Sequence, residues 1–430
     1  MFTQLQWPLY WQPSKQAKGM RVQSIEAILG QLTANESIFI AGSSAEPRPV
    51  VETLYRLSAQ LPPLEIVHSF VPGINNTPLA AAHNEITEIS IVPRKGYGSL
   101  DKKVGLIPCS YYGYDLFLSQ RRFDWCIVQV SPPDAKGRYC LGPSVEFLPQ
   151  VLRNSRLIIG VINPQVPNID GSAFIDGSLL THACEIDSPL VSYDAGDVDT
   201  VSAKISANVA TLVDDGSTLQ LGLGKIPAQL LEKLTDRSDL CFHTGLLTAG
   251  YFNLLEAGAL KVDKDHHTCA SLGDAAFYHR LGDTLRLKVC GVEYTHAPAT
   301  LAELGSLVAI NSAIEVDLFG QANLEFVGNR QVSSSGGAPD FARAARTAPY
   351  GKSIIALPAT AAKGAVSRIV PRLPTHQPIS LARHDIDYVV TEFGVAHISG
   401  QPVASRAHAL ISVAAPEFRE SLEKSLDTYR

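Results

Sequence analysis

Short apolar segments rich in β-branched residues recur along the whole chain, and they constrain its fold more than any other feature. Each is apolar almost without interruption, which is typical of strands covered on both faces of a mostly parallel sheet. Helical stretches lie between them, such as the one with Ile226, Leu230, Leu231 and Leu234 on one face. This alternation predicts an α/β fold with right-handed crossovers. The expected strands span residues 37–42, 64–70, 125–131, 156–163, 218–224, 306–312, 353–359 and 387–394.

An internal repeat divides the chain into two parts. Residues 37–54 (SIFIAGSSAEPRPVVETL) align without a gap onto residues 217–234 (STLQLGLGKIPAQLLEKL), with five identities at one offset of 180 residues. A D-x-x-G turn at 134–137 recurs at 317–320, at an offset of 183. The common offset favours duplication of an α/β unit, and residues 187–202 are polar and turn-rich, as expected of a boundary. We therefore predict two related α/β halves with largely parallel sheets, over 1–190 and 200–430, and a ligand site where they face one another.

Composition excludes several classes of protein. The net charge of −6, with both signs spread along the chain, argues against a nucleic-acid-binding protein, which would carry a basic excess. No run of about 18 apolar residues occurs, so we expect no membrane span. The first sixteen residues lack the features of a secretory signal, which predicts a cytoplasmic protein. Seven cysteines, none in a C-x-x-C pair, are expected to be free structural thiols, and no pattern predicts a metal site.

The strongest local motif is DDGSTLQLGLGKIP at 214–227. A strand is expected to end at Leu221, Gly222 and Gly224 form a loop, and Pro227 lies in the first turn of the next helix. Glycines at such a bend let backbone approach a ligand, and free N–H groups there can hold an anion such as a pyrophosphate. The alternative is a tight turn that needs positive φ, because the motif is neither a Rossmann fingerprint nor a Walker loop.

A second glycine-rich loop, SSSGGAPDFARAAR at 333–346, precedes another expected helix. Adjacent Gly336 and Gly337 leave two backbone N–H groups free to point at one oxygen, as an oxyanion hole requires. The alternative is a flexible surface loop. Downstream, Lys363 and Arg368 lie near apolar strand ends, where they could meet phosphates or simply be solvated.

Histidines give weaker signals. His243, in the expected strand LCFHTGL at 240–246, fits a hydrogen-bonding core residue better than a catalyst. The pair His266–His267 lies in a charged stretch and is expected at the surface.

Taken together, the motifs resemble the acetyl-CoA hydrolase/transferase family, most closely its 4-hydroxybutyrate CoA-transferase branch. The resemblance covers nearly the whole chain. It is specific because the matching segments occur together and in the same order as in the family. The matching segments are AEP (45–47), VSPPDAKG (130–137), INPQVP (162–167), DDGSTLQLGLGKIP (214–227), VAINSAIEVDLFGQAN (308–323), SGGAPDFARAA (335–345), SRIVP (367–371), DYVVTEFGVA (387–396) and SRAHALISVAAPEF (405–418).

The resemblance implies a family I CoA-transferase fold and a defined chemistry. Such enzymes attack an acyl-CoA with a glutamate carboxylate and pass through an acyl anhydride and a glutamyl-CoA thioester before CoA moves to a second acid. It also implies coenzyme A as a substrate, no tightly bound cofactor or metal, and a homodimer or larger oligomer. Gly337 would supply an oxyanion N–H. The residues implied to line the CoA site are Gly222, Leu223, Gly224, Lys225, Ile226, Ser333, Gly337 and Lys363.

One departure concerns the nucleophile itself. The family places its glutamate in an H-[ST]-E segment after the G-x-G-x-I-P loop, and here that segment reads His243-Thr244-Gly245. Glu256 and Glu293 match other family segments and are not displaced nucleophiles.

Three hypotheses follow from the departure. The leading one is an acyl-CoA:carboxylate CoA-transferase that uses a short acyl-CoA, such as acetyl-, butyryl- or 4-hydroxybutyryl-CoA, and acetate or a similar acid. The second is an acyl-CoA hydrolase. The third is a catalytically impaired CoA-binding homologue. Gly245 is the feature that separates them, and neither a nucleic acid nor a membrane is expected as a partner.

Overall fold

A computed structural model of the chain describes residues 20–82, 85–93, 101–284, 286–375 and 377–427. The first sixteen residues, which the sequence predicts to carry no secretory signal, lie outside these ranges. No helix in the described ranges is long and apolar enough to span a membrane.

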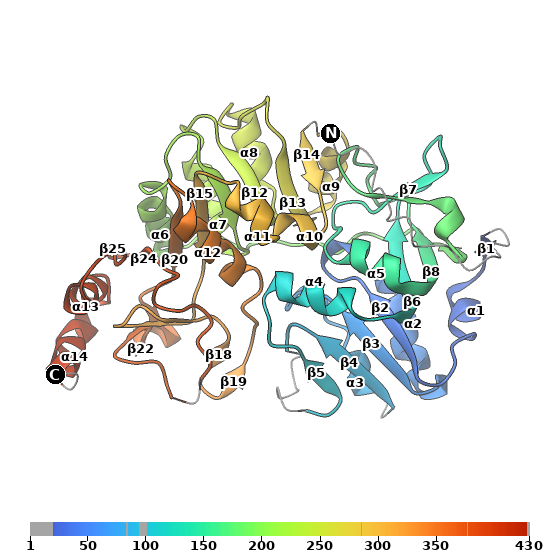
Figure 1. Cartoon of the computed structure of the whole chain (residues 1–430), viewed down its shortest axis with the longest axis horizontal. Coiled ribbons are helices and arrows are strands. Elements are labelled where there is room, and N and C mark those ends of the chain that lie inside the picture. The colour runs from blue at the N-terminus through green and yellow to red at the C-terminus, as the bar shows by residue number, and fades with distance from the viewer. Residues whose placement is uncertain (1–19, 83–84, 94–100, 285, 376, 428–430) are drawn as a thin grey trace. The chain divides into compact units, whose positions relative to one another are not determined.

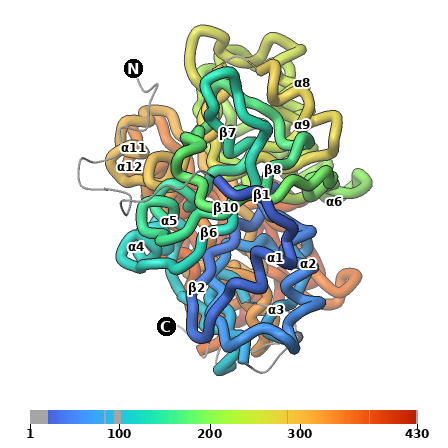
Figure 2. The backbone as a smooth tube through the Cα atoms, turned by 90° about the vertical axis from the view of Figure 1, so that its right-hand side faces the viewer, coloured from blue at the N-terminus to red at the C-terminus, as the bar shows by residue number. Residues whose placement is uncertain are grey.

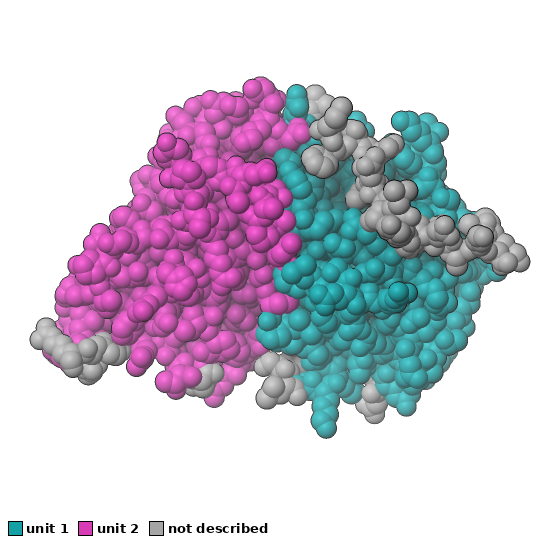
Figure 3. Space-filling view, viewed as in Figure 1, with its two compact units in different colours: residues 1–108, 113–194, 267–294 teal, residues 109–112, 195–266, 295–430 magenta. Residues whose placement is uncertain are grey.

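The chain forms two compact units (Figure 3). Unit 1 comprises residues 1–108, 113–194 and 267–294, and unit 2 comprises residues 109–112, 195–266 and 295–430. The main division, between Asp194 and Ala195, falls within the turn-rich segment 187–202. Two short segments are assigned across that division, so the compact units do not follow a single cut in the sequence.

Unit 1 contains an eight-stranded sheet in the order β1-β10-β8-β6-β2-β3-β4-β5. All neighbouring strands in this order run parallel, as expected for nearly continuous apolar segments (Figure 1). Antiparallel β7 (Arg138–Cys140) and β9 (Phe174–Asp176) form a separate ribbon. The strands of the main sheet are β1 (Arg21–Val22), β2 (Glu36–Ile40), β3 (Leu64–His68), β4 (Ile86–Ser90), β5 (Val104–Leu106), β6 (Phe123–Val130), β8 (Ser155–Ile162) and β10 (His182–Glu185).

Helices α1 and α2 pack against each other beside this sheet (Figure 2). Ile28, Leu54 and Trp125 belong to the buried apolar cluster that joins these helices to the strands. The helices of this part of the chain are α1 (Ile25–Leu29), α2 (Arg48–Leu57), α3 (Leu79–Ala82), α4 (Tyr111–Ser119), α5 (Leu148–Asn154), α9 (Ala275–Gly282) and α10 (Val292–Thr295), with short 3-10 turns η1 (Ser43–Ala45), η2 (Ser58–Gln60) and η3 (Gly177–Leu179). Strands β13 (His266–Ser271) and β14 (Leu287–Val289) flank α9.

Unit 2 contains strands in the order β12-β11-β15-β20-β24-β25. Neighbours are parallel except for the final pair, β24 and β25. The strands are β11 (Thr218–Leu221), β12 (Cys241–Leu247), β15 (Leu307–Asn311), β20 (Lys352–Ala356), β24 (Tyr388–Thr391) and β25 (Gly394–His397). Smaller ribbons are formed by β16 (Glu315–Asp317), β17 (Ala322–Asn323), β18 (Phe326–Val327), β19 (Arg330–Gln331), β21 (Thr360–Ala361), β22 (Val366–Ser367) and β23 (Ile369–Val370).

The helices of unit 2 pack on this sheet and on one another. Helix α6 packs on α7, and α12 packs on β15 and β20. Leu357, Val389 and Leu410 are fully buried in the apolar cluster beneath α13. The helices are α6 (Thr200–Ala210), α7 (Lys225–Lys233), α8 (Gly250–Glu256), α11 (Pro298–Ala302), α12 (Ala338–Thr347), α13 (Val403–Ser412) and α14 (Pro416–Leu426), with the 3-10 turn η4 (Ala362–Gly364).

The predicted α/β class with largely parallel sheets is confirmed, and each expected strand overlaps an observed one. Two expectations are wrong in detail. The segment 387–394 is not one strand, because β24 ends at Thr391 and Gly394 begins the antiparallel β25. The pair at 266–267 is not at the surface. His266 is 2% exposed, its Nδ1 accepts from the Phe242 N–H, and its Nε2 donates to the Lys261 carbonyl. The prediction was wrong because the charged residues that precede His266 resemble a surface loop, although β13 begins at His266.

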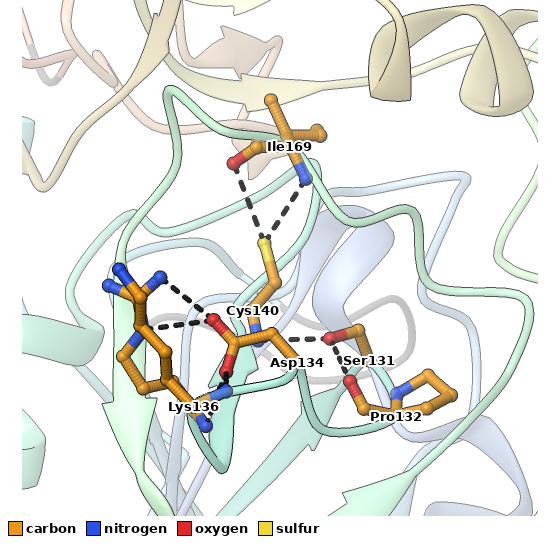
Figure 4. Close-up of polar contacts among 7 residues, drawn as sticks. Ser131, Pro132, Asp134, Lys136, Cys140 and Ile169 are labelled. Carbon is orange, nitrogen blue, oxygen red and sulfur yellow. Dashed lines mark hydrogen bonds and ion pairs between the residues drawn. The ribbon is translucent and has the colours of Figure 1, made fainter.

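The two aligned segments occupy equivalent positions in their units. The order β3-β2-β6-β8-β10 in unit 1 matches β12-β11-β15-β20-β24 in unit 2, and every pair in both is parallel. The two D-x-x-G turns also match in detail. Asp134 Oδ1 accepts from the N–H groups of Lys136 and Arg138 (Figure 4), and Asp317 Oδ1 accepts from those of Phe319 and Gln321. These equivalences support the predicted duplication.

Candidate functional site

The loop after β11 is an open turn at the start of α7. Gly224 caps α7 with a φ of +122°, which is the backbone region that favours glycine. A Cβ added at Gly222 or Gly224 would meet no atom within 4 Å. Gly222, Leu223 and Gly224 are half-buried, so the loop backbone can be approached by a ligand, and N–H groups at a helix start suit an anion.

Lys225 and Ile226, which follow Gly224, differ in the contacts that their side chains make. The Lys225 amino group lies 3.3 Å from Asp199 Oδ2. The pKa of Asp199 is lowered, first by the Ser202 N–H that it accepts as the cap of α6 and further by Lys225. Ile226 is buried in the core, and its carbonyl accepts from the Ser206 hydroxyl. The Lys225 charge is therefore already paired, and the Ile226 side chain faces away from solvent.

Gly245, where the family resemblance implies a glutamate, lies in the second half of β12. The preceding Thr244 joins it to the glycine loop, because the Thr244 hydroxyl both accepts from the Leu221 N–H and lies 3.2 Å from the Leu221 carbonyl. Gly245 is half-buried and its φ is not positive, so its backbone can accept another residue. The structure thus brings Gly245 to the level of Gly222 at the carboxyl ends of neighbouring parallel strands.

A buried histidine lies directly against Gly245. A Cβ built on Gly245 would be 3.2 Å from His296 Nε2, and one built on Gly337 would be 2.6 Å from the same atom. The imidazole is 1% exposed and packs near the Tyr111 and Phe341 rings, at centroid distances of 5.4 and 4.7 Å. Its Nδ1 lies 2.9 Å from the Thr295 hydroxyl. Burial, with the neighbouring His243 second, lowers the pKa of His296 to about 3, so the ring is neutral at neutral pH.

The second glycine loop reaches this histidine at the start of α12. Gly336 has a φ of +55°, and Gly337 caps the helix. Within the described residues, the N–H groups of Gly336 and Gly337 donate no hydrogen bond. They therefore remain available to a ligand oxygen, as the oxyanion interpretation of the sequence requires.

A short segment of unit 2 secures this loop. Tyr111 N–H donates to the Gly336 carbonyl at 3.0 Å. Asp340 accepts from the Ser110 hydroxyl at 2.7 Å and from the Tyr112 N–H at 3.1 Å. Burial raises the pKa of Asp340 to about 6, against these two donors, which lower it. Tyr111 is thereby held beside the His296 ring.

Ser333 begins the second glycine loop, and in the described ranges no hydrogen bond joins Ser333 or Lys363 to the loop at Gly222. The Ser333 N–H donates to the Glu325 carbonyl, and the half-buried Ser333 hydroxyl lies 3.3 Å from the Ser334 carbonyl. Lys363 is exposed in η4 with a φ of +57°.

The other candidate residues, His243, Glu256 and Glu293, occupy positions within the helices, strands and core of the fold. His243 Nε2 donates to the Thr295 carbonyl at 2.8 Å in the core, as the sequence favoured. Glu256 ends α8. Glu293 lies 3.5 Å from Arg153, and burial raises its pKa. No group of three or more His, Cys, Asp or Glu side chains in the described ranges is arranged to hold a metal ion.

Sequence reasoning missed His296, Tyr111 and Asp340. They are separated from the glycine loops by long stretches of chain, and no spacing rule connects them. The only sequence signal was the position of His296 in an otherwise apolar and small segment, THAPA at 295–299.

The fold, the family models and the relatives place this chain in the CoA-transferase class of enzymes. Models of the acetyl-CoA hydrolase/transferase N-terminal and C-terminal domains match residues 101–211 and 273–426, and the chain belongs to this family. The resemblance drawn from the sequence is thereby confirmed.

Relatives and solved structures agree with this membership. A 4-hydroxybutyrate coenzyme A transferase of Clostridium kluyveri is 31% identical over 94% of this chain and 96% of its own. RipA from Yersinia pestis superposes with a TM-score of 0.89 at 28% identity, covering 95% of this chain and 97% of that one. A 4-hydroxybutyrate CoA-transferase from Porphyromonas gingivalis gives 0.81 at 29% identity, with 95% and 98% covered. An acetyl-CoA hydrolase of Kluyveromyces lactis, 27% identical over 76% of this chain and 71% of its own, is also similar.

Proposed function

We propose that this chain is an acyl-CoA:carboxylate CoA-transferase that moves CoA from a short acyl-CoA to acetate or a similar small acid. Acetyl-CoA, butyryl-CoA and 4-hydroxybutyryl-CoA are the donors of choice, since relatives named for butyryl-CoA and 4-hydroxybutyrate transfer are similar over most of the chain. We further propose a cytoplasmic homo-oligomer with no tightly bound cofactor, built of domains at 1–190 and 200–430.

The observation that carries the proposal is the open glycine turn before α7. Gly222 and Gly224 leave space in which no protein atom lies within 4 Å of an added Cβ. The proposal assigns Gly222, Leu223, Gly224 and the backbone of Lys225 to CoA. The positive φ of Gly224 accounts for glycine at that position of the turn, whereas Gly222 has no positive φ and its missing side chain is left for a ligand to use.

Because Gly245 carries no carboxylate, the proposed transfer is direct. The acceptor carboxylate attacks the thioester carbonyl carbon, and the CoA thiolate leaves as a mixed anhydride forms. The thiolate then attacks the acceptor's carbonyl carbon, which forms the new thioester and releases the donor acid as a carboxylate. Holding both acids beside the thiolate replaces the covalent steps that a glutamate would provide.

Hydrolysis is a second candidate, and the same glycine favours it. With no side chain at 245, a water molecule can attack the thioester carbonyl, giving the free acid and the CoA thiol. A relative named acetyl-CoA hydrolase, from Kluyveromyces lactis, is similar over 76% of this chain.

One assay separates the candidates. Purified protein is given a series of short acyl-CoAs with radiolabelled acetate, and labelled acetyl-CoA and free thiol are measured together. Label in acetyl-CoA without net thiol release supports transfer, whereas thiol release without label supports hydrolysis. Neither product, with any donor in the series, would contradict the proposed function.

A further inference from the structure

The Nε2 edge of the His296 ring lies close to the place where the side chain of residue 245 would begin. Its Nε2 would lie 3.2 Å from a Cβ at Gly245 and 2.6 Å from a Cβ at Gly337. Both distances are shorter than ordinary carbon–nitrogen contacts, so the ring edge rests directly on two glycines. The two positions that sequence reasoning assigned to the nucleophile and the oxyanion donor therefore share one neighbour, which that reasoning did not identify.

The ring is held in a fixed orientation. Thr295 meets Nδ1 at 2.9 Å, and the Tyr111 and Phe341 rings lie beside the imidazole. Tyr111 is itself tied to the second glycine loop through its N–H and the Gly336 carbonyl. A side chain positioned by its neighbours in this way is suited to a directional hydrogen bond.

Nε2 is the unused end of this ring. In the part of the chain that the structure describes, no hydrogen bond reaches Nε2. Gly337, whose N–H donates no hydrogen bond within the described residues, lies against this atom, since a Cβ built on Gly337 would be 2.6 Å from Nε2. Two potential donors thus lie together, with no side chain of residue 245 or 337 between them and a ligand.

We propose that His296 is a catalytic hydrogen-bond donor, whose Nε2–H joins the Gly337 N–H in binding the carbonyl oxygen of the acyl thioester. In this assignment the Thr295 hydroxyl donates to Nδ1 and the proton lies on Nε2. The inference rests on the proposed function, because it requires an acyl-CoA at this site.

The environment favours a donor over a base. Burial, with His243 second, keeps the pKa of His296 far below neutrality, and no carboxylate of the described residues raises it, so the imidazole stays neutral. Such a weakly basic ring is a poor acceptor of a proton from water at neutral pH. A neutral N–H, by contrast, can stabilise negative charge on the thioester oxygen without gaining or losing a proton during attack. The attacking group, a carboxylate or water, then comes from solution.

The test uses two replacements of the same residue. His296→Gln keeps an N–H close to the Nε2 position, whereas His296→Phe keeps a flat ring without a donor. We expect His296→Phe to lower turnover of acyl-CoA by about a hundredfold or more, and His296→Gln to stay within about tenfold of the unmodified protein. CoA affinity is expected to change less than about twofold in both. His408→Gln, at an exposed side chain on α13, is the matched control and should leave turnover unchanged.

A spectroscopic readout separates the donor from other roles. Isotope-edited infrared spectra of bound [1-13C]acetyl-CoA should show the carbonyl band shifted to lower wavenumber in the unmodified protein and in His296→Gln, and less shifted in His296→Phe. If His296→Phe unfolds, His296→Leu provides the donor-free comparison.

Each outcome decides the assignment. An equal loss of turnover in His296→Gln and His296→Phe, with the shift of the carbonyl band retained, would identify His296 as a base. Equal turnover in the two variants and the unmodified protein would identify a packing role. Either result overturns the inference. Turnover without a shifted band in the unmodified protein overturns the inference and leaves the proposed function standing. If the unmodified protein binds no acyl-CoA, the proposed function fails, and the inference fails with it.

Discussion

The first strand–glycine–helix connections of the two units occupy the same place in the same strand order, yet one is closed and the other open. In unit 1, Gly42 is buried, and a Cβ there would lie 2.2 Å from the Ser69 carbonyl oxygen. The following Ser43 N–H donates to Asn75 Oδ1 at 2.8 Å. In unit 2, Gly222 is half-buried and an added Cβ meets nothing. Packing thus requires glycine at 42 in unit 1, whereas no atom near Gly222 in unit 2 excludes a side chain.

A second pair of positions shows the same contrast. The residue before the cap of α5 is Glu146, with a φ of +40°, and the residue before the cap of α12 is Gly336, with a φ of +55°. Glu146 is 3% exposed and accepts from the Ser69 hydroxyl. Gly336 is half-buried in an open loop. At both pairs of positions the chain makes an equivalent connection. In unit 1 that connection is buried by packing, whereas in unit 2 its backbone is accessible to a ligand.

The largest expected effect comes from alanine at the closed glycine. Gly42→Ala should destabilise the protein by about 3 kcal/mol or more, because the added carbon collides with backbone that cannot move aside. Gly222→Ala should change the free energy of unfolding by less than about 0.5 kcal/mol. Urea denaturation of both variants measures the difference, and equal stability would contradict the contrast between the two connections.

The next largest effect is the pH dependence that Glu146 gives to the free energy of unfolding. Burial raises the pKa of Glu146 to about 8, above its ordinary value of 4.5, so the folded protein holds this proton and the unfolded chain releases it earlier. Its contribution to stability is therefore fully present below pH 4.5 and is lost as the pH rises through 8. Glu146→Gln should remove this decline, a difference on the order of a few kcal/mol. Glu52→Gln, at an exposed position of α2, is the control and should leave the decline intact.

Valine at the open glycine tests ligand binding without disturbing the protein. Gly222→Val should weaken CoA affinity by at least tenfold, about 1.4 kcal/mol, because its side chain fills the space assigned to the ligand. Gly305→Val is a matched control, since a Cβ at Gly305 also meets nothing within 4 Å. Calorimetry showing unchanged affinity in a folded Gly222→Val protein would remove CoA from this loop.

Lys363 should give the smallest effect. The side chain is exposed, so its attraction to the CoA phosphates is screened by salt. Lys363→Ala should lose a few-fold in CoA affinity at low salt and less at high salt. Lys424→Ala removes the same charge from the exposed surface of α14 and should have no such effect. A loss that does not depend on salt would indicate packing instead.

The sequence predicted local features well and contacts between distant segments poorly. Apolar periodicity located the strands, and the turn at Gly222 was correctly placed because strand, glycine and helix signals are adjacent in the chain. His296 was missed because its proximity to Gly245 depends on β12 and the segment that precedes α11 meeting in space. His266 was misplaced because its charged neighbours resemble a surface loop, although it pairs with Phe242 and Lys261 in the core.

The central claim is that this chain activates an acyl thioester without forming a covalent enzyme intermediate. Mass spectrometry after incubation with acyl-CoA and borohydride tests it, with Gly245→Glu as the positive control. A Cβ at position 245 would lie 3.2 Å from His296 Nε2, so the ring has to shift by only a few tenths of an ångström and is kept. We predict that the unmodified protein keeps its mass, while Gly245→Glu gains a reduced glutamyl residue at 245. A reduced glutamate at any position in the unmodified protein would contradict it.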